Sequence, residues 1–275
     1  MSRVVVNITN NGITSTSPIP PILNNSNIIG QLTRYYLLGD QIKVIKDSNL
    51  QVRIYNEENN KEYYVPISDD FIKQVGDWGW TIICKLGTGS THSAFLVYDG
   101  RDFKTMLILD SITKKDNNID EIEDNIDDII EIKGYDLYMN KVEHVFYTSV
   151  PYSDNEIYKI LSPNNYINRP IYILEFMFYT ISEFIILKRN IWNVNEKKIF
   201  ISQFKMFYNK SMQFFKDNNI NYSDIKLDNI MIGYYNGMSY LKFVDIHDVK
   251  IDKFIINTRD KLIELLDELN MLLEV

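Results

Sequence analysis

The chain of 275 residues contains a single cysteine, Cys84, so no disulfide can form within it. Disulfides belong to oxidising compartments, and a lone cysteine inside an apolar run favours a reducing one. Basic residues are also scarce, because 29 lysines and arginines stand against 37 aspartates and glutamates and the formal net charge is −8. A protein that binds nucleic acid normally shows a basic face, so we expect no nucleic-acid partner.

Long apolar runs are missing as well. The first residues carry no apolar stretch of the length that a signal peptide needs. The most apolar long segment, residues 171–188, is interrupted by Glu175 and Glu183, so it does not predict a membrane span. We therefore expect an intracellular, cytoplasmic protein without a membrane partner, of undetermined oligomeric state. The chain is nevertheless 45% hydrophobic and 13% aromatic, which is enough for a large core.

Shifts in composition predict the domain organisation. Residues 1–30 hold a short β-like run and then a segment rich in asparagine, serine, threonine and proline, which predicts a flexible arm. Residues 31–75 show strand-like alternation and predict a small β extension. Residues 76–177 carry further strand patterns, and residues 178–275 carry mainly helical ones.

A polar loop stands out in the last quarter of the chain. Residues 221–229 run Asn-Tyr-Ser-Asp-Ile-Lys-Leu-Asp-Asn and place Asp224, Lys226 and Asn229 within six residues. The loop follows a long helical pattern and precedes an apolar strand, residues 230–232. A carboxylate, an amine and an amide are thus brought into one short loop.

A hairpin after this loop predicts the place of a further carboxylate. Asn236-Gly237 lies between two apolar strands, and a tight primed turn needs positive φ at both central residues. The second strand leads into Asp245, which the hairpin would bring close to Asn229. Oxygen ligands for Mg²⁺ beside a base that can receive a hydroxyl proton are what phosphoryl transfer from a nucleotide requires.

These residues carry a family resemblance. The loop resembles the catalytic loop of eukaryotic-type protein kinases, H-R-D-x-x-x-x-N, with Tyr222 in the place of the histidine, and Asp245-Ile-His247 stands where those proteins carry D-F-G. The Asp-x-Lys-x-x-Asn form is closest to serine/threonine kinases. The resemblance covers roughly residues 80–275 and implies a two-lobed α+β kinase-like fold, with an antiparallel β N-lobe over residues 76–177 and a reduced helical C-lobe over residues 178–275.

The resemblance also implies cofactors and roles. The cofactors would be ATP and Mg²⁺, with Asp224 accepting the hydroxyl proton and Lys226 neutralising charge on the transferred phosphoryl group. Asn229 and Asp245 would hold the metal. The substrate would be a protein hydroxyl, so a protein substrate or a regulated protein is the expected partner.

A glycine turn precedes this loop in the sequence. Gly87, Thr88 and Gly89 lie between two predicted strands, and glycines let backbone N–H groups approach phosphate oxygens. The turn resembles the kinase glycine-rich loop, G-x-G-x-x-G, with His92 in the place of the third glycine. An ordinary hairpin turn is the alternative.

The next predicted strand departs from the kinase pattern. Leu107 stands where the resemblance implies a lysine for the α- and β-phosphates. Lys104 is three residues upstream and should point to the opposite face, because side chains alternate along a strand. Lys85, on the neighbouring strand, is the candidate substitute. The missing charge makes a pseudokinase that acts as a binding scaffold or regulator the alternative function.

Other expected positions follow the order of the chain. An acidic helix over residues 116–133 would stand for the kinase C-helix, with Glu131, or secondly Glu123, pairing with the lysine. Backbone groups of about Glu175 to Met177 would bind adenine as a hinge, unless this is an ordinary buried strand. Asp260 would brace the loop or cap the final helix.

The last part of the chain departs from the family too. It has no A-P-E motif, no long activation segment and no substrate-binding helical subdomain, so the resemblance is to a divergent, C-terminally truncated kinase. The abundance of asparagine, isoleucine, lysine and tyrosine suggests an AT-rich genome such as that of a virus or parasite, and a viral protein would be expected in the host cell cytoplasm. A metal-hydrolase site on His92, His144 and His247 is disfavoured, because these residues lack ligand spacing.

Overall fold

The computed structural model describes residues 50–56, 61–89, 92–109, 119–161, 169–235, 238–246 and 249–274. They form two compact units. The first unit contains the described part of Thr33–Ile119 together with Val142–Phe176, and the second contains Asp120–Lys141 and Met177–Val275. The predicted arm, residues 1–30, and the first part of the predicted β extension lie outside the described residues.

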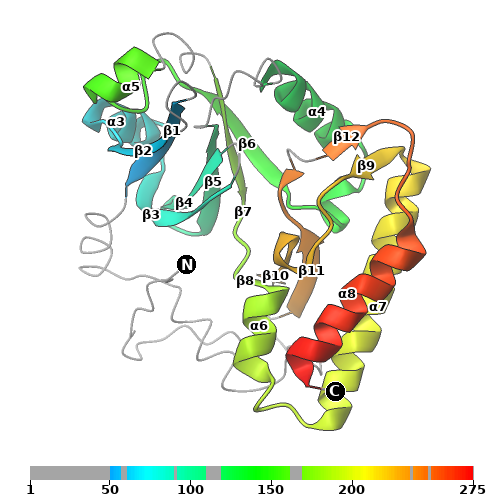
Figure 1. Ribbon diagram of the computed structural model, residues 1–275. Helices are drawn as coiled ribbons and strands as arrows, with labels where there is room; N and C mark the ends of the chain where they lie inside the picture. Colours follow the sequence, from blue (N-terminus) through cyan, green and yellow to red (C-terminus); the bar gives the residue numbers. More distant parts are fainter. Residues whose placement is uncertain are drawn as a thin grey trace. The chain divides into compact units, whose positions relative to one another are not determined.

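The first unit is built on a five-stranded antiparallel sheet (Figure 1). Its strands, in spatial order, are β3 (Thr81–Thr88), β4 (His92–Tyr98), β5 (Phe103–Leu109), β7 (Pro170–Glu175) and β6 (Val142–Tyr147). β-Branched and aromatic residues dominate these segments, which suits a pleated surface that is buried on at least one face. The strands predicted on both sides of the glycine turn are therefore confirmed, as are the two predicted around residues 142 and 171.

The two faces of this sheet carry different neighbours. One face packs with the hairpin of β1 (Gln51–Asn56) and β2 (Lys61–Pro66) and with α3 (Asp69–Asp77) in the larger apolar core. We call it the core face; it includes Ile82, Phe95 and Met106. The opposite face carries a smaller cluster around Ile83 and Leu96. We call this the Leu107 face, because Leu107 pairs with Ala94, whose neighbour in sequence, Phe95, lies on the core face.

Helices make up most of the second unit. They are α4 (Ile119–Glu131), α6 (Ile181–Lys188), α7 (Val194–Asp217) and α8 (Thr258–Leu273), with α7 and α8 side by side (Figure 1). Two of them begin at capping boxes, in which Thr180 and Glu183, and Asn193 and Glu196, satisfy each other's backbone N–H groups. The first unit adds a short helix, α5 (Glu156–Leu161), and the second adds two 3₁₀ turns, η2 (Tyr135–Leu137) and η3 (Leu227–Asn229).

Small sheets complete the second unit. The hairpin of β10 (Ile230–Tyr235) and β11 (Met238–Phe243) pairs with β8 (Tyr179–Thr180), and β9 (Ile220–Tyr222) pairs with β12 (Val249–Ile251). Phe243 lies at the centre of an aromatic core, with ring centroids 5.2 Å from Tyr222, 5.4 Å from Phe207 and 5.5 Å from Phe215. The phenylalanines of α7 that contact Phe243 therefore lie on its core-facing side.

The predicted α+β class, with an antiparallel sheet unit and a mainly helical unit, is confirmed. Among the described residues, none of the helices has both the length and the apolar character that crossing a bilayer requires.

Candidate functional site

In the polar loop of the second unit, buried apolar residues alternate with more exposed polar ones. Ile225 and Leu227 are buried, whereas Lys226 is exposed and Asp224 is half-buried. Polar and apolar positions therefore alternate, and the apolar side chains fix the loop while the polar ones face outward. The loop ends in η3, whose last residue, Asn229, is buried.

Asp224 is held by both of the other predicted residues of the loop. The Lys226 ammonium forms an ion pair with Asp224 Oδ2, and Asn229 Nδ2 donates to Asp224 Oδ2 and to its backbone oxygen at 2.9 Å each. Burial acts to raise the pKa of the Asp224 carboxyl, but the hydrogen bonds from Lys226 and Asn229 and the charges of Lys226 and Lys261 outweigh it and leave the pKa below its ordinary value. Asp224 is therefore ionised at neutral pH.

The hairpin brings Asp245 next to this loop. The register pairs Ile230 with Phe243 and Tyr235 with Met238, and the Val244 N–H donates to Asn229 O at 2.9 Å. The Tyr222 hydroxyl donates to Val244 O, so both backbone groups of the residue before Asp245 are bound within the unit. The backbone of Asp245 therefore lies close to that of Asn229, as predicted.

Asp245 has an unusual backbone. Its φ of 61° lies in the left-handed region, which costs energy for residues other than glycine and which aspartate tolerates better than most. Such outliers persist where the surrounding structure over-determines them and are common at functional sites. His247, two residues on, lies outside the described residues.

These residues suit a hard cation. Both hydrogens of the Asn229 amide point to Asp224, which leaves Oδ1 as the atom able to ligate a metal. Together with the Asp245 carboxylate it offers the oxygen donors that Mg²⁺ prefers. The described residues contain no cluster of three or more histidine, cysteine, aspartate or glutamate side chains arranged to hold a metal.

The start of α8 contributes a charge that sequence reasoning missed. Lys261 is near enough to lower the pKa of Asp224 and forms a 2.9 Å ion pair with Glu264. No local pattern links Lys261 to the loop, so only the tertiary structure could reveal it. Asp260 is the acidic residue of the first turn and completes the cap that Asn257 makes: its N–H donates to Asn257 Oδ1, and its Oδ2 accepts from Asn257 Nδ2 at 2.6 Å. This agrees with the capping alternative for Asp260.

The glycine turn lies in the first unit. Gly87 and Thr88 end β3, and Gly89 follows. The Gly89 N–H donates to His92 O at 2.8 Å, so it is used inside the turn. A Cβ atom on Gly89 would lie 2.6 Å from His92 Cε1, so a larger residue here would force the imidazole that fills this space to move.

Both strand lysines lie on the core face. Lys85 pairs with Phe95, donates to Gln51 O at 2.9 Å and places its ammonium 5.3 Å from the centroid of the Tyr64 ring. Lys104 lies on the same face, as its odd offset from Leu107 predicts, and forms a 2.8 Å ion pair with Glu143. Lys85 therefore lies on the face opposite Leu107, which argues against its role as the substitute lysine.

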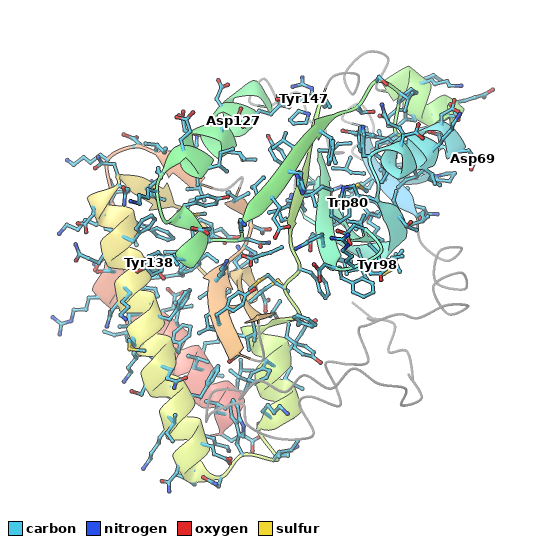
Figure 2. All side chains as sticks on the ribbon, turned by 180° about the vertical axis from the view of Figure 1, so that it is seen from behind. Asp69, Trp80, Tyr98, Asp127, Tyr138 and Tyr147 are labelled. Carbon is cyan, nitrogen blue, oxygen red and sulfur yellow. The ribbon has the colours of Figure 1, made fainter. Side chains whose placement is uncertain are left out.

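The acidic helix is confirmed as α4, with Ile126 and Ile129 buried. Glu131 is exposed, and Glu123 is half-buried. Asp127, which is labelled on α4 in Figure 2, has a raised pKa because of burial and because of the neighbouring charges of Asp124, Asp128 and Glu131. Glu131 is thus part of an exposed acidic surface.

The predicted hinge lies at the boundary between the units. Glu175 ends β7 and belongs to the first unit, whereas Met177, which is buried, begins the last segment of the second. Glu175 pairs with Lys104 across the sheet, and Phe176 packs with the cluster on the Leu107 face. The backbone here thus ends a strand beside a partly exposed apolar surface.

Comparisons with known proteins find likeness in structure and none in sequence. No protein-family model matches the chain, and no curated protein matches it. Among solved structures, the crystal structure of the kinase domain of PF14_0431 aligns with 66% of this chain at 14% sequence identity and a TM-score of 0.44. The alignment covers 54% of that chain, so this protein spans about half the length of the structure it resembles. A likeness this weak carries no argument about function.

Proposed function

We propose that the chain is an ATP-dependent phosphotransferase of the serine/threonine protein kinase-like type, which transfers the γ-phosphate to a protein hydroxyl. The observation that carries the proposal is the state of Asp224. Its carboxylate is ionised, held by Lys226 and Asn229, and placed in a loop whose backbone is bonded to the residue before Asp245. If Asp224 were an acidic residue that stands in a solvated loop by chance, it would not need these contacts with Lys226 and Asn229.

Each residue of the loop has a role in this proposal. Asp224 accepts a hydrogen bond from the attacking hydroxyl and takes its proton as the new O–P bond forms and the bond to ADP breaks. Its low pKa makes it a weak base, so it orients the hydroxyl first and receives the proton late. Lys226 neutralises charge on the transferred group. Asn229 and Asp245 would hold Mg²⁺, which supplies further charge neutralisation on the phosphates when bound.

The adenine would bind in the first unit. Cys84, Leu86, Tyr98, Phe103 and Phe176 form a partly buried apolar surface on the Leu107 face, around Ile83 and Leu96. The rings of Tyr98 and Phe103 contact each other at a centroid distance of 4.8 Å, tilted by 32°, and Figure 2 labels Tyr98 at the end of β4. A partly buried apolar surface that includes Phe176 suits a purine base, which is flat and has hydrogen-bonding edges.

The second candidate is a pseudokinase that binds and regulates another protein. It is favoured by Leu107 and by the two strand lysines, because both ammonium groups lie on the core face. A nucleotide held without that charge would be positioned poorly, and transfer would be slow even with the loop intact.

The test measures Mg²⁺-dependent ATP binding by calorimetry and γ-phosphate transfer to a generic protein substrate. Asp224→Asn should lower the transfer rate by about 10²- to 10⁴-fold, the usual contribution of a general base, and leave ATP affinity nearly unchanged. Asp228→Asn is the matched control, because Asp228 is an exposed acid of the same loop. Binding without transfer by the wild type selects the pseudokinase, and a wild type that does not bind Mg·ATP overturns the phosphotransferase.

A further inference from the structure

The second unit contains a cavity of about 260 Å³ between α7 and the β10–β11 hairpin. Its apolar walls are formed by Phe200, Phe204 and Phe207 of α7 and by Ile232 and Leu241 of the hairpin. Every residue that lines it belongs to the described part of the chain. The cavity is therefore a feature of one unit and does not depend on how the two units are placed.

The walls are held from behind by the aromatic core. The Phe200 ring lies 5.1 Å from the ring of Trp192, and the Phe207 ring lies 5.4 Å from the ring of Phe243, measured between centroids. Phe204 is fully buried. Because these side chains are packed on the side away from the cavity, its shape is set before any ligand arrives.

The cavity has the size and lining of a ligand site. An apolar cavity of about 150 Å³ holds a benzene molecule, so in proportion this one has room for about ten carbon atoms. Gln203 and Met206, which also line it, are exposed and therefore lie at its mouth, and Ser239 adds a half-buried hydroxyl. An apolar interior with a few polar groups suits a molecule that has an apolar body and a polar head.

The elements around the cavity are basic, although the chain is acidic. Residues 197–216 of α7 contain five lysines and no acidic residue, and β10 and β11 contain one lysine and no acidic residue, whereas the net charge of the chain is −8. Lys210 is exposed and follows Met206 by one turn. The Lys242 ammonium lies 5.0 Å from the centroid of the Tyr240 ring, which lines the cavity. Positive charge beside an apolar cavity favours a ligand with an anionic head.

We propose that this cavity binds a medium-chain fatty acid, with the chain between α7 and the hairpin and the carboxylate at the mouth. Transfer of the chain from water to the apolar walls drives binding. The carboxylate accepts hydrogen bonds from the Gln203 amide, the Ser239 hydroxyl and the Lys210 ammonium. The inference goes beyond the proposed phosphotransferase activity, because none of the residues that line the cavity has a role in that activity.

The test measures the affinity of the full-length wild type for decanoate, hexanoate, dodecanoate and decanol by calorimetry. Decanoate should bind about a hundred-fold more tightly than hexanoate, because each buried methylene contributes about four-fold. Dodecanoate should stay within about three-fold of decanoate, since its chain is longer than the room for about ten carbon atoms. Decanol should bind about ten-fold more weakly than decanoate, because it lacks the charge.

Two pairs of variants locate the site. Ser239→Phe places a ring in the cavity and should weaken decanoate binding by at least about ten-fold, the loss expected when two buried methylenes are displaced. Ser202→Phe is the matched control, because Ser202 is an exposed residue of α7 that does not line the cavity. Lys210→Met should weaken the binding of decanoate by about two- to five-fold and leave that of decanol unchanged, whereas Lys216→Met should match the wild type.

Three results would overturn the inference. If the wild type does not bind decanoate, the cavity is left to another occupant, such as a side chain of a partner protein. Equal affinities for decanol and decanoate would mean that the ligand is neutral. Equal losses in Ser239→Phe and Ser202→Phe, or no loss in either, would place decanoate elsewhere on the protein. If Ser239→Phe does not fold, Gln203→Phe narrows the mouth from α7 and takes its place. Mg·ATP binding by the same wild-type preparation tests the proposed function separately.

Discussion

The loop and hairpin of the second unit and the glycine turn of the first unit depart from the kinase pattern to different degrees. In the loop, Asp224, Lys226 and Asn229 are present and contact one another. At the turn, two glycines remain, but the lysine position holds Leu107 and an imidazole packs against Gly89. The groups that would act on the transferred phosphoryl group are thus kept, and those that would hold the nucleotide are altered.

The two regions should differ most in how much of their stability depends on aromatic packing. Phe243 is fully buried among three rings, and its backbone N–H and oxygen bond to Tyr138 O and Asn140 N. Phe243→Ala should destabilise the second unit by about 3–5 kcal/mol, the range for buried aromatic truncations, and should speed hydrogen exchange in β10 and β11. The measurement is hydrogen exchange followed peptide by peptide together with urea unfolding.

Phe103→Ala is the counterpart in the first unit. Phe103 is only partly buried and belongs to the small cluster on the Leu107 face. Its truncation should cost roughly 1 kcal/mol, because less apolar area leaves the core. Equal losses for the two variants would contradict the contrast between a packed hairpin and an exposed apolar face.

A second contrast concerns buried lysines. Lys188 of the second unit is 1% exposed, its ammonium has no hydrogen-bond partner among the described residues, and the nearest ring centroid, that of Phe184, is 6.0 Å away. Lys188→Met should therefore stabilise the protein by about 1–3 kcal/mol at pH 7, the cost of an unsatisfied buried polar group. Lys104→Met in the first unit should destabilise by roughly 1 kcal/mol, because it breaks the ion pair with Glu143.

The pH dependence of the free energy of unfolding shows whether buried Lys188 stabilises or destabilises the fold. Burial lowers the pKa of Lys188 below 10.5, so between the lowered pKa and 10.5 the unfolded chain binds more protons than the folded one. The free energy of unfolding therefore falls as pH drops through this window and stays reduced below it. Lys188→Met should remove this dependence in thermal melts taken between pH 7 and 10.5. A melting temperature that falls in the variant would show that the amine has a partner in solution.

Local patterns explain what could be predicted. The hairpin after Asn229 follows from the apolar strands on either side of Asn236-Gly237, and its strands pair as expected. The four residues of the loop and hairpin could be named for the same reason, since they are near one another in sequence or joined by one hairpin.

The side on which Lys85 lies could not be predicted. Strict alternation from Ile82 would place Lys85 on the face opposite Ile82, which is the Leu107 face. A bulge between Ile82 and Cys84 shifts the register of β3, and Lys85 lies on the core face with Ile82 instead. The charge of Lys261 at Asp224 could not be predicted either, because it depends on how α8 packs. Bulges and long-range contacts have no local sequence signal.

The smallest predicted effect is on the titration of Asp224. Its pKa is lowered from the ordinary value of 3.8, so any stability it contributes is present above that value and is lost as pH falls through the lowered pKa. Because the side chain is 42% exposed, this contribution is screened and should be small. Activity should likewise show no loss from Asp224 protonation until the pH is below 3.8.

The causes of this shift can be separated by substitution. Lys226→Met removes a hydrogen bond and a charge, and should raise the pKa of Asp224 more than Lys261→Met, which removes only a charge from farther away. The carboxyl carbon shift of Asp224 followed by NMR gives the pKa in each variant, with the exposed Lys253→Met as control. An unchanged pKa in Lys226→Met would mean that Asn229 alone holds the carboxylate. Asp224 would then stay ionised without Lys226, and in the proposed function Lys226 would act only on the transferred phosphoryl group.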